Sequence, residues 1–273
     1  MRRAGVRAGE RGNRGEIEVM AKYPTNQERT AEYLKRFDRE KTLKYLIQDA
    51  APLILDVGAN VGTTLDEFKA WWPGAVVHCF EPQQECWEPL EQRAARYPGT
   101  VVVNRFAVGN RSNPEATFYT HDISHGLSGF NKLNLQSLDS IDLKKATDRG
   151  AVALEAYARS LNHERRVRID RLDDYMSAAG ISRVNLLKMD TQGYEPEVLE
   201  GVGSRLHDID VVISELNFFD YYERSLSFSD LERFLLPAGF RLYDLSHISK
   251  NPMNGRTDWV DVIYAHDRIR RRA

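Results

Sequence analysis

Short apolar runs alternate with amphipathic stretches along most of this chain. The runs have the length of buried strands, and they cover residues 53–57, 76–80, 101–103, 186–190 and 211–215. Apolar residues at helical spacing follow the first two of them. Strands that alternate with helices predict an α/β fold, in which a mostly parallel sheet carries helices on both faces.

Helices are predicted at 25–47, 62–72, 83–96 and 228–236, with a further helix starting at 172. Thr25 and Glu28 have the spacing of a capping box, in which the hydroxyl and the carboxylate each bind a free backbone N–H. The first helix precedes the first strand. We expect it to pack on the sheet. The alternative is that it covers one side of a cofactor pocket.

The remaining segments are less regular. Residues 240–245 and 259–265 are two strands joined by a polar loop, which indicates an antiparallel pair at the sheet edge. The third strand is expected to run on towards Phe106 and Ala107, residues 117–119 to add a short edge strand, and 166–169 to form an alternating strand. Residues 121–164 are long for a plain connection, so we predict a substrate-side insertion or lid there.

Length and charge restrict the class of protein. A chain of 273 residues and 31.3 kDa suits one large domain, expected at 23–267. The net charge of −2 gives no electrostatic field that would attract nucleic acid or an anionic membrane surface. No apolar run approaches the length of a membrane span, roughly 18 residues. Cys79 lies in a predicted buried strand and Cys86 at a helix start, so we expect free thiols and a cytoplasmic location.

The two ends of the chain differ from the rest in composition. Five arginines and four glycines fall within the first nineteen residues, with almost nothing to bury. We predict a disordered tail at 1–22, with Met20 as a possible natural start and a functional arm as the alternative. Residues 268–273 are expected to form a basic C-terminal tail.

The first strand and the turn after it carry the main chemical signal. The pattern is Asp56-x-Gly58-x-Asn60-x-Gly62, and the second strand ends in Glu81. Ligands of open parallel sheets bind at the carboxyl ends of the strands. A glycine turn there lets a ligand approach the backbone, and free N–H groups at the helix start suit an anion. An acid at the end of the second strand is placed to accept hydrogen bonds from ribose hydroxyls. The pattern predicts a nucleoside pocket.

The turn favours S-adenosylmethionine over a dinucleotide. A dinucleotide site normally reads G-x-G-x-x-G, which brings backbone to a pyrophosphate, but here Asn60 stands where the second glycine would be. S-adenosylmethionine has no pyrophosphate, and its tail carries an ammonium and a carboxylate. Asp56 and the amide donors behind it fit that zwitterion better.

Four motifs in order resemble the FkbM-type family of S-adenosylmethionine-dependent methyltransferases. The most specific is Leu187-Lys188-Met189-Asp190-Thr191-Gln192-Gly193-Tyr194-Glu195, where the family usually shows K-x-D-x-E-G-x-E. The others are the residues from 172 to 175, the loop from 56 to 62, and 80–82. The likeness spans roughly residues 54–265 and covers 121–164 poorly. Gln192 departs from the family's glutamate, which puts in doubt any role that needs a charge there.

The resemblance implies a class I methyltransferase fold, a Rossmann-like seven-stranded sheet whose last strand is antiparallel. It places the methionine end of the cofactor on Asp56, Gly58, Asn60 and Gly62, the ribose on Glu81, and the adenine beside Phe106 and Ala107. Asp190 would lie next to the methyl group. There it would either accept the proton of the acceptor hydroxyl or only orient the acceptor. Glu195 is expected at a helix start, bound to backbone, with a catalytic role as the alternative.

Two further hypotheses concern a general base and a metal site. His125 lies in a serine- and glycine-rich loop and is either a general base reaching in from the insertion or an exposed side chain. Asp190, Glu215 and Asn217 are oxygen ligands at adjacent strand ends and resemble the magnesium arrangement of catechol-type methyltransferases. Acids at strand ends without a metal are common, so a divalent metal is possible and not favoured.

The function expected from these motifs is O-methylation of a hydroxyl on a sugar, glycan or secondary metabolite. The acceptor class comes from the resemblance, because fold does not set substrate. N-methylation of nucleic acid would favour a (D/N)-P-P-(Y/F) element after the fourth strand, where this chain has Asp190-Thr191-Gln192-Gly193. An NAD-dependent oxidoreductase would need the glycine that Asn60 replaces. A non-catalytic binding protein is the remaining alternative. The expected partner is a small-molecule or glycan acceptor, without nucleic acid or membrane.

Overall fold

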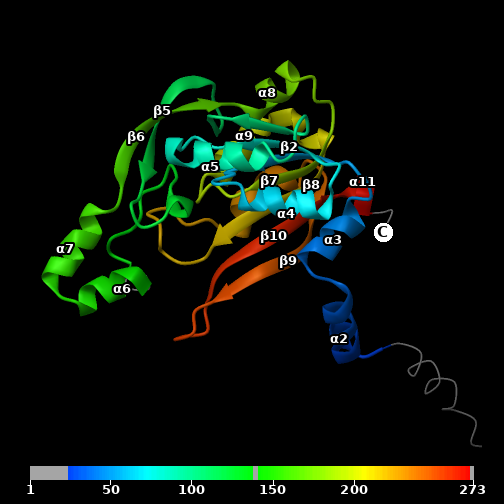
Figure 1. Ribbon diagram of the computed structural model, residues 1–273. Helices are drawn as coiled ribbons and strands as arrows, with labels where there is room; N and C mark the ends of the chain where they lie inside the picture. The colour runs from blue at the N-terminus through cyan, green and yellow to red at the C-terminus, as the bar shows by residue number, and fades with distance from the viewer. Residues whose placement is uncertain (1–23, 138–140, 271–273) are drawn as a thin grey trace, which may run out of the picture.

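The computed structural model describes residues 24–137 and 141–270 (Figure 1). The predicted tail at 1–22 and the last three residues of the predicted C-terminal tail lie outside these ranges. A seven-stranded sheet forms the centre, in the order β3-β2-β1-β7-β8-β10-β9. Its strands are β1 (Leu53–Val57), β2 (Val76–Phe80), β3 (Val101–Asn104), β7 (Val184–Met189), β8 (Ile209–Asn217), β9 (Phe240–Lys250) and β10 (Thr257–His266).

The pairing of the strands confirms the expected class of sheet. Strands β1, β2, β3, β7 and β8 pair in parallel. Strand β10, the last along the chain, is antiparallel to both β8 and β9. The strand order reverses beside β1, which is paired with β2 on one side and with β7 on the other. The carboxyl ends of β1, β2 and β7 therefore meet at one edge, where ligands of open α/β sheets bind.

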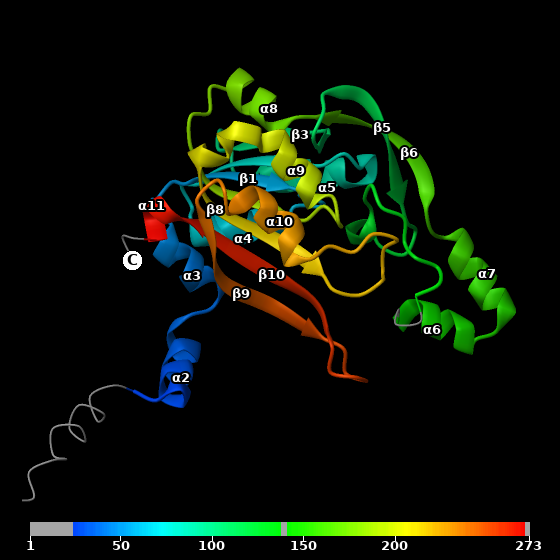
Figure 2. The ribbon, with the colours of Figure 1, turned by 180° about the vertical axis from the view of Figure 1, so that it is seen from behind.

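Helices cover both faces of the sheet, as predicted (Figures 1 and 2). Alternate residues of a strand point to opposite faces, so Ile54 joins one buried cluster and Leu55 the other. The cluster of Ile54 includes buried residues of α3 (Arg39–Leu46), α4 (Thr63–Trp71) and α5 (Gln84–Ala94). The cluster of Leu55 includes residues of α8 (Leu172–Ala178), α9 (Glu195–Val202) and α10 (Phe228–Leu235).

The N-terminal helical segment is two helices, where one was predicted. Helix α2 (Asn26–Arg36) has the expected capping box, in which Thr25 Oγ1 accepts from the N–H of Glu28 and Glu28 binds back to Thr25. The helix stops at Phe37, and Asp38 caps α3 by accepting the N–H of Lys41 at 2.8 Å. A side-chain acceptor in the middle of the apolar pattern therefore starts a new helix. Helix α3 packs against the sheet, as expected.

A second sheet was not predicted. It consists of β4 (Ala107–Val108), β6 (His163–Asp170) and β5 (Asn113–Thr120), in that order. The third central strand ends at Asn104 and does not run on to Ala107, because β4 pairs with β6 in this second sheet. Between β5 and β6 lie the 3₁₀ turn η1 (His125–Leu127), α6 (Ile141–Asp148) and α7 (Ala151–Arg159), and the two α-helices project from the body in Figures 1 and 2.

The end of the described chain is packed on the body. Residues 203–208 form a second 3₁₀ helix, and α11 (Asp267–Arg270) follows β10 directly. Arg268 Nε donates to Asp210 Oδ1 at 2.8 Å, so residue 268 is held to the start of β8. Both cysteines are free and buried. None of the helices in the described ranges is long and apolar enough to cross a membrane.

Candidate active site

The loop between β1 and α4 is shaped by three residues with positive φ. These are Gly58 (79°), Asn60 (48°) and Gly62 (85°). The N–H groups of Gly58 and Ala59 both donate to the carbonyl oxygen of Phe80, which ties the loop to the end of β2. A Cβ at Gly58 would lie 2.0 Å from the carbonyl oxygen of Asp190. The close approach that requires this glycine is therefore to strand β7 of the same chain, whereas the sequence suggested approach by a ligand.

Glu81 is the acid at the end of β2, and the same loop holds it. Its Oε2 accepts the N–H of Asn60 at 2.8 Å, and its Oε1 accepts the N–H of Gln83 at 2.7 Å. The residue is buried, with 6% of its surface exposed. Burial raises the pKa of Glu81 to about 7, although the two backbone donors favour the ionised form. The carboxylate is thus fixed in place, and each of its oxygens keeps a lone pair for a further donor.

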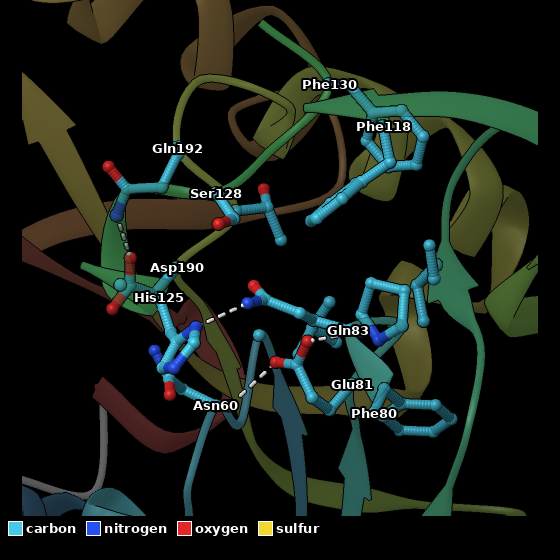
Figure 3. A pocket seen from close by; sticks show the side chains of 17 residues that line it. Asn60, Phe80, Glu81, Gln83, Phe118, His125, Ser128, Phe130, Asp190 and Gln192 are labelled. Carbon is cyan, nitrogen blue, oxygen red and sulfur yellow. Dashed lines mark hydrogen bonds between the residues drawn. The ribbon is translucent and has the colours of Figure 1, made fainter. Parts of the chain in front are cut away.

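A cavity of about 580 Å³, its open mouth included, lies at this edge of the sheet. Six of the predicted site residues line it: Gly58, Asn60, Glu81, Ala107, His125 and Asp190. Figure 3 shows Glu81 and Asn60 at its floor, with Phe118 and Phe130 on one side and Asp190 on the other. An adjoining cavity of about 840 Å³ shares Gly58, Asn60, His125, Gly126 and Asp190 with the first and reaches the start of α4.

The structure does not bring Asp56, Gly62 and Phe106 to the wall of either cavity. Asp56 is fully buried, and its Oδ1 lies 3.2 Å from Lys188 Nζ. Lys188 Nζ also donates to Gly58 O at 3.1 Å and lies 3.6 Å from Asp190 Oδ2. Burial opposes the charge of Lys188, but the carboxylates of Asp56 and Asp190 outweigh it and raise its pKa. The charge of Asp56 is therefore matched within the protein.

Phe106 and Gly62 have packing roles. The ring of Phe106 packs against Phe80 and Tyr175, with centroids 5.6 and 6.0 Å away. Gly62 is the N-cap of α4, and a Cβ there would lie 2.8 Å from Leu90 Cδ1. The backbone turn at residues 105–107 thus points Ala107 into the cavity and Phe106 into the core.

Several lining residues were missed by the sequence interpretation. Phe118 of β5 and Phe130 form a T-shaped pair with centroids 5.2 Å apart, and together with Phe80 and Val108 they supply apolar lining of the cavity. Phe118 lies in the predicted edge strand at 117–119, and Phe130 lies in the region 121–164, whose structure the sequence left open. Gln83 Nε2 lies 2.6 Å from His125 Nδ1, so this pair bridges the loop after β2 and η1 (Figure 3). His125 itself is exposed and lines both cavities.

Asp190 lies at the end of β7 beside a second acid. Gln192 Nε2 donates to Asp190 Oδ1 at 2.6 Å and to Glu215 Oε1 at 3.4 Å. Asn217 Nδ2 also donates to Glu215 Oε1, at 3.0 Å. Within residues 24–137 and 141–270, no group of three or more His, Cys, Asp or Glu side chains is arranged to hold a metal ion. Glu195 begins α9 and accepts the N–H of Thr191 at 2.7 Å, as expected of a residue at a helix start.

The sheet order, the antiparallel last strand and the cavity at the strand ends together define a class I methyltransferase fold. The chain belongs to the family described as Methyltransferase FkbM domain, whose model matches residues 56–242. It is therefore a methyltransferase, and the resemblance drawn from its motifs is confirmed.

Three characterised relatives are similar to parts of this chain. The 31-O-demethyl-FK506 methyltransferase FkbM of Streptomyces tacrolimicus is 26% identical over 60% of this chain and 68% of its own length. The hexuronic acid methyltransferase AglP of Haloferax volcanii is 23% identical over 65% of this chain and 62% of its own. The 2-O-methyltransferase NoeI of Sinorhizobium fredii is 25% identical over 66% of this chain and 70% of its own. The chain thus spans about two thirds of the length of these relatives.

Cofactor affinity is expected to depend on pH through Glu81. Its pKa of about 7 leaves the carboxyl mostly neutral at pH 6 and mostly ionised at pH 8. Ribose hydroxyls are donors, and an ionised carboxylate accepts from them more strongly. The dissociation constant of S-adenosylhomocysteine, measured by calorimetry, should therefore fall by up to about tenfold from pH 6 to pH 8. Glu81→Gln should bind more weakly and lose this dependence; an equal pH dependence in that variant would refute the assignment.

Proposed function

We propose that this chain is an S-adenosylmethionine-dependent methyltransferase that methylates a hydroxyl of a sugar, glycan or secondary metabolite. The observation that carries the proposal is the position of Glu81. Its buried carboxylate is fixed by two backbone N–H groups in the wall of the cavity that Asp190 also lines. An acceptor for ribose hydroxyls and a candidate group for the acceptor hydroxyl therefore share one cavity.

The residues present fit the cofactor. The cavity lies within the range of small-molecule sites, roughly 300–1,000 Å³. Glu81 would accept from the ribose hydroxyls, and the apolar wall of Phe80, Phe118 and Phe130 would contact the adenine. The adjoining cavity near the start of α4 offers backbone N–H groups and Thr63 to a carboxylate. When bound, S-adenosylmethionine supplies a methyl group on a positively charged sulfur.

The acceptor side of the proposal rests on Asp190 and on the relatives. Asp190 keeps a carboxylate at the cavity wall, with a side chain 35% exposed, where it would accept a hydrogen bond or the proton of an acceptor hydroxyl. Aligning that hydroxyl with the methyl group would supply much of the rate. Two of the three relatives carry an O-methyl position in their names and the third a hexuronic acid, which supports a hydroxyl-bearing acceptor.

The identity of the methyl donor is tested by calorimetric titration of the purified chain with three ligands. S-adenosylmethionine and S-adenosylhomocysteine should bind, because both carry the ribose and the amino-acid tail. NAD should not bind, since the loop has Asn60 in place of the glycine that a pyrophosphate needs. Tight binding of NAD without binding of S-adenosylmethionine would overturn the proposal. Transfer of labelled methyl groups to a panel of hydroxyl- and amine-bearing glycans then tests the acceptor, and methylation of amines alone would contradict O-methylation.

A further inference from the structure

The amide of Gln192 lies between two carboxylates. Its Nε2 has two hydrogens, and the amide donates to Asp190 Oδ1 at 2.6 Å and to Glu215 Oε1 at 3.4 Å. Asp190 directly follows β7 and Glu215 lies near the end of β8, so two neighbouring parallel strands bring their acids to the same place. Gln192 itself is 9% exposed.

The orientation of this amide follows from its partners on both sides. The hydroxyl of Tyr222 lies 2.6 Å from Gln192 Oε1, and Tyr222 is 3% exposed. An ionised carboxylate can only accept, so the NH₂ group belongs on the side of the acids, and the oxygen lies on the side of the hydroxyl, which can donate to it. The reverse orientation would direct the oxygen at two carboxylates. The backbone of Gln192, at φ 56°, is held by Asn131 Nδ2, which donates to its carbonyl oxygen at 3.0 Å.

The two acids have other partners besides Gln192. Lys188 lies 3.6 Å from the second oxygen of Asp190 and also serves Asp56, while Asn217 donates to Glu215. Burial and the charge of Asp190 raise the pKa of Glu215 to about 8.

Further acids lie around Asp190 and Glu215. Asp261 of β10 pairs with Glu215 in the sheet register. Its carboxylate lies 3.5 Å from Arg39 and 3.2 Å from His247. Glu195 at the start of α9 also acts on the charge of Glu215. Adjacent buried acids that lack a bridging donor share a proton or bind a cation.

We propose that Gln192 is a positioning residue whose amide bridges Asp190 and Glu215, and so fixes the Asp190 carboxylate at the cavity wall. Asp190's part in methyl transfer rests on the function proposed above; the bridging role of Gln192 does not. The amide is neutral, so it fixes the direction of the Asp190 side chain without adding a charge.

Gln192→Glu tests the bridging role without any turnover. The change adds a third carboxylate between two others, so the folded state should hold it protonated, and stability should fall as pH rises. We expect the melting temperature to drop by roughly 4–8 °C more between pH 6 and pH 8 than in the wild-type chain. The matched control is Gln92→Glu, because Gln92 Nε2 also donates to a carboxylate, that of Glu88 at 3.1 Å, but on the exposed face of α5.

The outcomes of this experiment separate clearly. Recovery of the Gln192→Glu chain by 1 mM Mn²⁺ would show that a cation can replace the amide, and recovery by acid alone would show that a proton can; either supports the proposal. Melting curves that follow those of Gln92→Glu at both pH values, with and without Mn²⁺, would overturn it.

Gln192→Met tests the effect on Asp190, because methionine has a similar length and no N–H. The turnover number should fall by about tenfold or more, with the KM for S-adenosylmethionine within about twofold of wild type, since the change misdirects Asp190 and leaves Glu81 untouched. An unchanged turnover number would refute the positioning role. If the wild-type chain methylates none of the acceptors, the function proposed above fails, and the melting experiment still decides the bridging role.

Discussion

Asp190→Asn is expected to lower methyl transfer by about 10²- to 10⁴-fold, the range typical of losing a general base. Asparagine has the same shape, and its amide oxygen can still accept from Gln192 Nε2, which lies 2.6 Å from Asp190 Oδ1 in the wild-type chain. The variant therefore removes the charge and keeps the position. Initial rates with labelled donor measure the loss, and calorimetry with S-adenosylhomocysteine should give an affinity within about twofold of wild type.

A matched control for this variant is Asp49→Asn. Asp49 is exposed and accepts the N–H of Ala51 just before β1, at the opposite end of the strands from the cavity. It should leave the rate unchanged. A near wild-type rate in Asp190→Asn would remove Asp190 as the base and leave it the role of orienting the acceptor, because an amide oxygen can accept a hydrogen bond but cannot take up the proton at neutral pH.

Gly58→Ala is expected to destabilise the fold by about 3 kcal/mol or more. The new Cβ would lie 2.0 Å from the carbonyl oxygen of Asp190 and 3.0 Å from its carbon, and both are backbone atoms with no freedom to swing away. The positive φ of 79° adds strain. Thermal unfolding should show a midpoint lowered by about 6 °C or more. Any folded fraction should bind S-adenosylhomocysteine weakly, because the strand that carries Asp190 must shift.

Gly99→Ala separates the two causes. Gly99 has nearly the same dihedral angle, φ 76°, but a Cβ there would meet nothing within 4 Å. This control carries the backbone strain without the collision, so its midpoint should fall by only about 2–4 °C. Equal losses in the two variants would show that β7 gives way to the new methyl group and that the contact does not require glycine.

The sequence was sufficient to predict those elements whose pattern of apolar residues is local. Apolar runs that end in an acid predicted β1, β2, β7 and β8, and the acids at their ends, Glu81, Asp190 and Glu215, meet at one edge because parallel strands share their direction. The hairpin of β9 and β10 was predicted from two runs joined by a polar loop. The periodicity of apolar residues indicates which face of an element is buried, and each of these elements buries one face.

The parts that the sequence did not predict depend on distant contacts. Strand β5 pairs with β6 across more than forty residues, as in Thr120 with His163, and neither segment carries a pattern that names its partner. The apolar cavity wall at Phe118 and Phe130 depends on that pairing. Asp56 was expected at the ligand, but Lys188, one strand away, takes up its charge. A motif gives residue types and spacing, whereas the direction of a side chain depends on its neighbours.

The base of the α6–α7 projection is closed by two residues. Leu133 N–H donates to Asn162 Oδ1 at 2.8 Å, and Asn162 Nδ2 donates to Leu133 O at 3.1 Å. The chain therefore leaves the body and returns to it at the same point, next to the paired ends of β5 and β6. The projection has further anchors on the body, because Asn134 N–H donates to Tyr221 O at 2.8 Å and Leu161 packs with Leu133 and Tyr222. Changes of length in α6 and α7 that keep these anchors should leave the strand register unaltered. Chimaeras of family members with different acceptors can be joined at these two residues, which keeps the donor site from one parent and takes the projection from the other.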